Sequence, residues 1–193
     1  MKNTYTINVC GIRRELPLVP INETLAYASF VVIGDTEMVS HAGRLLAEKV
    51  SDAEVIMTAE AKGIALAYEV SRCLGMKEFI VARKSVKSYM RSFESVELES
   101  ITTTGKQHLY LDEQDALKIR GKKICLVDDV ISTGQSVEAL ERLALQAGGT
   151  VIHKAAILAE GEAAARDDLT YLQVLPLFEK NTDGNYREIV PEH

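Results

Sequence analysis

The sequence predicts an α/β fold in which a mainly parallel sheet is flanked by helices. Short apolar runs of strand length alternate with helical periodicities between residues 36 and 176. The run at 123–129 (KICLVDD) shows no polar alternation, which is typical of a parallel strand that is covered on both faces. Strands that alternate with helices build right-handed βαβ units, so we expect one such sheet in a single domain over residues 1–193.

The first strand–helix units lie between residues 36 and 83. Residues 36–51 predict a helix, because apolar side chains recur at the i, i+3, i+4 and i+7 spacing. Residues 54–58 (EVIMT) predict a short buried strand, 61–74 a helix that ends at Gly75, and 79–83 (FIVAR) a second strand. The apolar stripe of the first helix consists of Met38, Val39, Ala42, Leu45, Leu46 and Ala47.

A long polar stretch, 84–122, separates these units from the rest of the sheet. Val96 and Leu98 precede the sequence ITTTGKQ, Leu109 and Leu111 follow it, and all four alternate with polar residues. This pattern predicts a hairpin that is half-buried at best.

The remaining elements follow the strand at 123–129. A helix is expected at 136–147, where an apolar face runs up to Gly148, and strands are expected at 150–159 and 170–176. Two polar stretches stay open. Residues 162–168 (EAAARDD) suit a helix or a partner contact, and the tail 179–193 can be ordered or not.

Composition excludes several classes of protein. The net charge of −6, from 22 Lys and Arg against 28 Asp and Glu, argues against a nucleic-acid partner, because such binding needs excess positive charge. Three widely spaced cysteines fit reduced thiols, and the four histidines lack metal-ligand spacing. The longest uncharged apolar stretch, 24–34, is too short to span a bilayer, and the N-terminus lacks a signal-peptide core. We therefore expect a cytoplasmic protein without a membrane partner.

The strongest functional signal follows the strand at 123–129. Asp128 and Asp129 place two carboxylates at the strand's end, and a loop of hydroxyls and glycine then leads into a helix. A helix start with close backbone approach suits an anion, whereas the carboxylates repel one. A ribose 5-phosphate satisfies both halves, with hydroxyls at the carboxylates and phosphate at residues 132–136. The structural alternative is a strand-end turn with Ser and Thr as helix caps.

The sequence VDDVISTG resembles the phosphoribosyl-pyrophosphate (PRPP) motif of type I phosphoribosyltransferases. The resemblance implies their fold, PRPP as co-substrate and Mg²⁺ bound with it. Asp128 and Asp129 are the candidate ligands of this ion, and the resemblance implies that they also hold the ribose as catalytic residues. The motif residues implied to bind substrate are Val130, Ile131, Ser132, Thr133, Gly134, Gln135 and Ser136.

A second motif, TAEAKG at 58–63, is similar to the pyrophosphate loop of adenine phosphoribosyltransferases, which typically read E-A-R-G. Lys62 stands where that family usually has Arg; it keeps the charge but loses the bidentate fork. The alternative is a plain helix start. The substrate-binding residues implied here are Ala59, Glu60, Ala61, Lys62 and Gly63.

A third motif is basic: no acid occurs between Glu78 and Glu94. Arg83, Lys84 and Lys87 resemble the start of the family's mobile catalytic loop, which implies catalytic roles for the two lysines and pyrophosphate binding for Arg83. The alternative is a solvated basic loop. The resemblance further implies a lid over 84–112, a hood formed by 1–35 with the C-terminal tail as an appendage, and a homodimer.

Three departures bear on the base. The lid glutamate of adenine enzymes falls on a Thr within 101–105, with Glu97 or Glu99 as candidate substitutes. Ser132 stands where hypoxanthine/guanine enzymes have Asp, and the orotate enzymes' His-Gly pair is missing. Transfer of ribose 5-phosphate to a purine, adenine first, is therefore expected, with xanthine or guanine open. The other alternative is a PRPP-sensing regulator of the same fold, although too few residues precede the first helix for a DNA-binding module.

Overall fold

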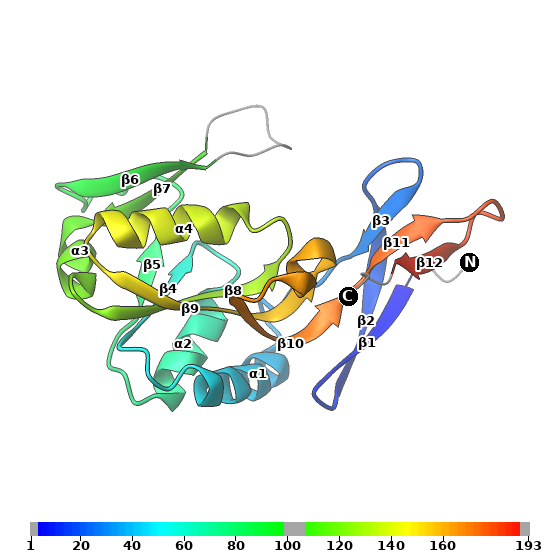
Figure 1. Cartoon of the computed structure of the whole chain (residues 1–193), viewed down its shortest axis with the longest axis horizontal. Helices are drawn as coiled ribbons and strands as arrows, with labels where there is room; N and C mark the ends of the chain where they lie inside the picture. The colour runs from blue at the N-terminus through cyan, green and yellow to red at the C-terminus, as the bar shows by residue number, and fades with distance from the viewer. Residues whose placement is uncertain (1–3, 99–106, 190–193) are drawn as a thin grey trace.

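The computed structural model describes residues 4–98 and 107–189. Its centre is a five-stranded, fully parallel sheet in the order β10-β9-β8-β4-β5, which confirms the predicted fold class (Figure 1). The strands are β4 (Val55–Ala59), β5 (Ile80–Ala82), β8 (Lys123–Ile131), β9 (Thr150–Glu160) and β10 (Leu169–Leu175).

Helices cover both faces of this sheet, so it lies between two apolar cores. The helices α1 (Thr36–Lys49) and α2 (Ile64–Cys73) pack on one face, and α4 (Gln135–Gln146) packs on the other (Figure 1). This arrangement explains the unbroken apolar run in β8: Cys125 and Val127 enter the first core, whereas Ile124 and Leu126 enter the second.

The hairpin consists of β6 (Phe93–Leu98) and β7 (Gln107–Asp112), and the short helix α3 (Glu113–Ile119) follows it. The hairpin is half-buried, as its alternation predicts: Leu109 and Leu111 have no exposed surface, whereas Glu94 and Ser95 are exposed. The two buried leucines pack in the second core together with Leu140 and Leu143 of the helix α4. The hairpin therefore shares the core that α4 forms with the parallel sheet. The tip of the hairpin and the position of the missing lid glutamate lie outside the described residues.

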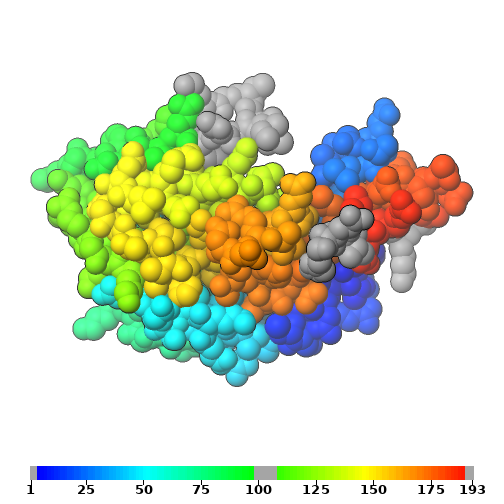
Figure 2. Space-filling view, viewed as in Figure 1, coloured from blue at the N-terminus to red at the C-terminus, as the bar shows by residue number. Residues whose placement is uncertain are grey.

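A second sheet, which the sequence patterns do not predict, lies at one end of the molecule. It is antiparallel, in the order β1-β2-β3-β11-β12, and joins both ends of the chain, as Figure 2 shows by colour. Tyr5 packs edge-on against Phe178 at a ring-centroid distance of 5.0 Å, within the first core. Its strands are β1 (Thr4–Val9), β2 (Ile12–Pro20), β3 (Leu25–Ala28), β11 (Leu177–Lys180) and β12 (Tyr186–Ile189).

Several element ends differ from the expected ones in ways that matter for function. The strand β8 runs on to Ile131, two residues past the expected end, so the adjacent aspartates lie just before the strand's end and not at its last position. The helix α2 starts at Ile64, which leaves residues 60–63 as a turn; together with Ala59, the last residue of β4, they form the segment called turn 59–63 below. Residues 161–165 form a 3₁₀ helix, η1 (Gly161–Ala165), and the described part of the C-terminal tail includes the strand β12 up to Ile189. In the described part of the chain, every helix is too short or too polar to cross a bilayer.

Candidate active site

The predicted motifs meet at the carboxyl edge of the parallel sheet. Turn 59–63 follows β4, the aspartate pair and loop 132–136 end β8, and Glu160 ends β9, which lies next to β8. In parallel sheets this edge is the usual place for ligands, because strand ends and helix starts converge there.

Two carboxylates sit side by side at the end of β8. The side chain of Asp129 is 3% exposed, and its Oδ2 atom has no hydrogen-bond partner among the described residues. The backbone N–H of Asp129 donates to Asp128 Oδ1 at 2.9 Å. Burial raises the pKa of Asp128, and the neighbouring negative charge of Asp129 raises it further. Such a pair calls for a cation or for hydroxyl donors.

The pair fits Mg²⁺ that arrives with a substrate. Magnesium prefers carboxylate oxygens and is usually bound through one or two of them plus substrate oxygens. Among the described residues no cluster of three or more His, Cys, Asp or Glu side chains could hold a metal alone. Asp128 and Asp129 would therefore share the ion with oxygens of the substrate.

The loop after β8 presents the start of α4 to solvent. Gly134, the N-cap, has φ +83°, a conformation that favours glycine, and no side chain caps the helix. The N–H groups of the first turn are therefore not paired by a capping side chain, which leaves them for an anion. Ser132, Thr133 and Ser136 add exposed hydroxyls, whereas Gly134 itself is buried.

Turn 59–63 is packed against β8 through a single glycine. A Cβ atom at Gly63 would lie 2.3 Å from Thr58 Oγ1 and 3.0 Å from the carbonyl oxygen of Val127. Lys62, in the same turn, is exposed, and its charge lowers the pKa of Asp128 and of Glu160 as a minor effect. The packing at Gly63 thus brings an ammonium group to the edge that carries the carboxylates.

The basic segment after β5 is held by Glu60. The Lys84 backbone N–H donates to Glu60 Oε2 at 3.0 Å, and Arg83 Nη1 and Lys87 Nζ each lie 3.6 Å from a Glu60 oxygen. The Lys84 amide, then the charges of Lys87 and Arg83, lower the pKa of Glu60 against the effect of its burial. Two motifs that the sequence analysis treated separately are therefore joined in one cluster. Lys87 also donates to Ser85 Oγ at 2.8 Å.

Two side chains near this edge were missed by the sequence analysis. Burial raises the pKa of Glu160, opposed by a hydrogen bond from Ser132 and by the charge of Lys62. Arg166, beyond η1, lies against Gly134: its Nη1 atom is 2.4 Å from where a Cβ would stand. Glu160 could have been found from the sequence, because the expected strand 150–159 ends one residue before it and ligands usually bind after the ends of parallel strands. Arg166 lies in the polar stretch 162–168, where the sequence pattern gives no position relative to the loop.

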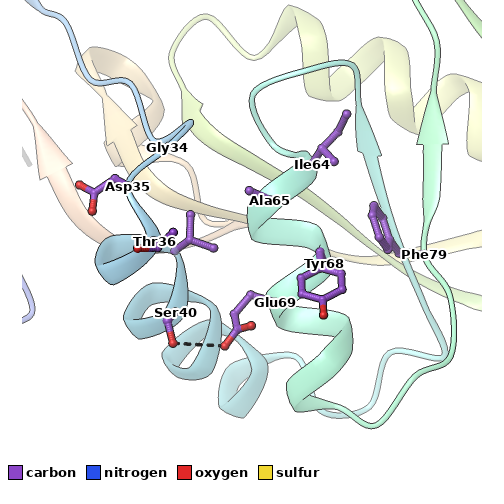
Figure 3. A pocket seen from close by; sticks show the side chains of 10 residues that line it. Gly34, Asp35, Thr36, Ser40, Ile64, Ala65, Tyr68, Glu69 and Phe79 are labelled. Atoms are coloured by element: carbon purple, nitrogen blue, oxygen red, sulfur yellow. Dashed lines mark hydrogen bonds between the residues drawn. The ribbon is translucent and has the colours of Figure 1, made fainter.

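A cavity of about 570 Å³ lies elsewhere, between the start of α1 and α2 (Figure 3). Its charged lining residues are Asp35 and Glu69, and each is already paired: Asp35 with Arg14 at 2.7 Å, Glu69 with Arg72 at 2.8 Å. Ser40 donates to Glu69 across the cavity at 3.4 Å (Figure 3). Without a cation in its lining, the cavity does not suit a phosphate, and the chemistry points to the sheet edge instead.

Comparisons with known proteins show the family of the chain. Residues 33–185 match the family model described as the phosphoribosyl transferase domain. Adenine phosphoribosyltransferase of Thermosipho africanus is 30% identical over 145 residues, which cover 72% of this chain and 79% of that protein. The Thermotoga neapolitana enzyme of the same name is 38% identical over 101 residues, 52% of this chain and 55% of that protein. The chain thus spans about half the length of the latter relative.

Solved structures share the fold. The crystal structure of adenine phosphoribosyltransferase from Thermoanaerobacter pseudethanolicus superposes with a TM-score of 0.68 at 19% identity and covers 83% of this chain and 95% of that one. A family model that matches four-fifths of the chain, a relative aligned over most of its length and the shared fold lead to one conclusion. The chain belongs to the phosphoribosyl transferase domain family.

Proposed function

We propose that this protein transfers ribose 5-phosphate from PRPP to a purine base, with adenine favoured. In this reaction the bond from C1 of the ribose to the pyrophosphate oxygen breaks, a bond from C1 to a purine ring nitrogen forms, and that nitrogen releases its proton. The products are a nucleoside monophosphate and pyrophosphate. The observation that carries the proposal is the carboxylate pair near the end of β8, of which Asp129 is buried, directly before an uncapped helix start.

The two halves of that motif would hold the two ends of ribose 5-phosphate. Ribose hydroxyls are donors, and Asp129 offers a buried carboxylate oxygen without a donor, beside Asp128. The phosphate would take the hydroxyls and free N–H groups of residues 132–136, with Val130 and Ile131 leading into the loop and Ile131 beside the base. Negative carboxylates beneath the sugar also favour positive charge at C1 as the bond breaks.

Pyrophosphate would lie between turn 59–63 and the basic segment. Lys62 and the cluster of Arg83, Lys84 and Lys87 supply four cations, of which two lie close to Glu60. Glu60 is one carboxylate against the three cations after β5, so the cluster keeps net positive charge for the leaving group. Asp128 and Asp129 would hold Mg²⁺ together with oxygens of PRPP, and the ion would supply positive charge for the leaving group.

Two further parts are proposed to surround the base. The antiparallel sheet, built from 1–35 and the C-terminal segment, would act as a hood, and 84–112 would act as a lid. What supports the lid is its position: the segment begins at the Glu60 cluster, and Arg83 and Tyr110 exchange backbone hydrogen bonds of 2.8 Å at its base. Closure of a lid would exclude water, which otherwise hydrolyses PRPP.

We also propose a cytoplasmic homodimer. Cys10, Cys73 and Cys125 are all free thiols, as is usual in a reducing compartment. Tyr68 is 56% exposed beside the apolar cavity, and Ile33 is 55% exposed just before α1. Exposed large apolar side chains around a concave surface suit a second copy of the chain. Light scattering at several protein concentrations tests this, and a monomer at every concentration would contradict it.

The decisive experiment is a panel assay with PRPP and Mg²⁺. Adenine, guanine, hypoxanthine, xanthine, orotate and uracil are each supplied, and both the nucleotide and pyrophosphate are measured. We expect pyrophosphate release that depends on a purine, greatest with adenine. Greatest turnover with xanthine or guanine would move the base assignment to them. PRPP binding without release for any base would instead favour a PRPP-sensing regulator.

A further inference from the structure

We propose that Arg166 is a positioning residue for the phosphate loop, and that it acts by neutralising Glu138 in the first turn of α4. This inference deepens the proposed function, because it concerns the affinity of loop 132–136 for the phosphate of PRPP. Neither residue belongs to the motifs that carry the family resemblance.

The contact between Arg166 and the loop is direct. Arg166 Nη1 lies 3.2 Å from Glu138 Oε1, and both atoms sit at Gly134: a Cβ there would be 2.4 Å from Nη1 and 3.2 Å from Oε1. Glu138 donates its backbone N–H to the carbonyl oxygen of Gly134, as the first intrahelical bond. The ion pair is therefore packed on the residue that turns the chain into α4.

A carboxylate at that place opposes the proposed ligand. The start of a helix attracts anions through its free N–H groups and its dipole, and a negative side chain in the first turn competes for both. Glu138 is the acidic residue in the first turn of α4, and its side chain is 47% exposed. With Arg166 Nη1 in contact, a positive charge lies beside Glu138 at Gly134, so the N–H groups can act on a phosphate against less repulsion.

Arg166 is held in place from behind. Asp168 accepts two hydrogen bonds from it, from Nε and Nη2, both at 2.9 Å. Lys154 Nζ bridges Asp168 Oδ2 and Glu141 Oε2, each at 2.8 Å, and is only 12% exposed. Because Glu141 follows Glu138 by three residues on α4, the network joins the helix to β9 and to the segment after η1 at two points.

The backbone that carries Arg166 is fixed as well. Ala163 and Ala164 of η1 are buried in the second core, and the Tyr171 hydroxyl donates to the Ala164 carbonyl oxygen at 2.8 Å. The hydrogen bonds to Asp168 and Glu138 raise the pKa of Arg166, which is charged at every working pH. A rigid backbone and a paired guanidinium make this a preorganised feature and not a chance surface contact.

The test is a double-mutant cycle on PRPP affinity. Arg166→Ala leaves Glu138 unneutralised at the helix start, so we expect PRPP binding about tenfold weaker. Glu138→Gln removes the repulsion and leaves Arg166 Nη1 without its carboxylate partner, so binding should tighten a few-fold. The double variant, Arg166→Ala with Glu138→Gln, should return to within about threefold of wild type. Titration calorimetry with PRPP gives these values, and in turnover Arg166→Ala should raise KM for PRPP with little change in kcat.

The matched control is Arg72→Ala. This variant also removes an arginine that forms two hydrogen bonds with a glutamate, since Arg72 Nε and Nη2 each donate to Glu69 at 2.8 Å. This pair lies on α2, away from loop 132–136. PRPP affinity should stay at the wild-type value, while circular dichroism reports that all variants are folded. Weak binding in the double variant, equal to that of Arg166→Ala, would overturn the proposal in favour of direct phosphate contact. Wild-type protein that binds no PRPP would instead refute the proposed function itself.

Discussion

The packing of turn 59–63 against β8 makes Gly63→Ala a sharp test of the pyrophosphate site. Gly63 has φ −73° and ψ −10°, which alanine adopts without strain. Judged from the backbone alone, the substitution should stabilise the protein by about 0.4–1 kcal/mol, because alanine restricts the unfolded chain. The space around Gly63 predicts the opposite sign.

The added methyl group would meet atoms on two sides. Thr58 Oγ1 would be 2.3 Å away, against 3.4 Å for an ordinary contact, so one of them must move by about 1.1 Å. Thr58 is fully buried, and the second neighbour, the Val127 carbonyl oxygen at 3.0 Å, is backbone of β8. Overpacking of this kind costs about 1–3 kcal/mol, which outweighs the gain from the unfolded state. We therefore expect a net loss of about 1–2 kcal/mol in the free energy of unfolding.

The same displacement should reach function, because the turn can relieve the clash only by moving away from β8. Urea unfolding measures the stability, and inhibition of turnover by added pyrophosphate measures the site; we expect pyrophosphate to bind about tenfold or more weakly. Adding Thr58→Ala to Gly63→Ala should recover part of both losses. Gly75→Ala is the control: Gly75 has φ +71° and open space around it, so stability falls while pyrophosphate inhibition is unchanged. Wild-type stability and inhibition in Gly63→Ala would refute the packing argument.

Three further predictions follow from other parts of the structure. Asp129→Asn should lower kcat by about a hundredfold or more while urea unfolding shows an intact fold, because the site loses a ribose acceptor; wild-type kinetics would contradict this role. In a thiol titration of the native protein, Cys10 and Cys73 should react and Cys125 only after unfolding, because burial raises its pKa to about 12; a third fast thiol would disagree. Hydrogen bonds from Arg166, and then from Lys154, hold the pKa of Asp168 below its ordinary 3.8. The ionised Asp168 therefore stabilises the folded protein fully above pH 3.8, and this stabilisation is lost as the pH falls further. Asp168→Asn should therefore be less stable than wild type by about 0.5–1 kcal/mol at pH 6, a gap that closes below pH 3.8 if the pair is responsible.

Local signals in the sequence were enough to predict the parallel sheet. The apolar run of β8 and the helical stripes of α1 and α4 are intrinsic patterns, and each appears close to its expected place. The antiparallel sheet was not predicted, because its strands come from opposite ends of the chain: Leu25 and Glu179 are register partners. Pairing over such a separation has no local signature.

The candidate site was likewise predicted only in part. Glycine, hydroxyl and carboxylate motifs can be read from consecutive residues, which is why Asp129 and Gly134 were found. The burial of Leu109 and the positions of Glu160 and Arg166 depend on which element lies beside them in space. Glu160 reaches the site because β9 pairs with β8, and Arg166 reaches it because η1 turns the chain back toward α4.

The charges at the sheet edge explain how an acidic chain can take a polyanion. Four carboxylates, Asp128, Asp129, Glu60 and Glu160, are matched by four cations, which are Lys62, Arg83, Lys84 and Lys87. Asp128 and Asp129 lie beneath the proposed sugar, whereas Glu60 lies among the cations, where pyrophosphate would sit, so the edge is dipolar and not simply negative. A ligand of uniform charge is attracted by one side of this edge and repelled by the other. A molecule that places neutral hydroxyls at the aspartates and phosphate groups at the cations and at the start of α4, with a divalent ion bound to it, is attracted on every side, and PRPP with Mg²⁺ is such a molecule.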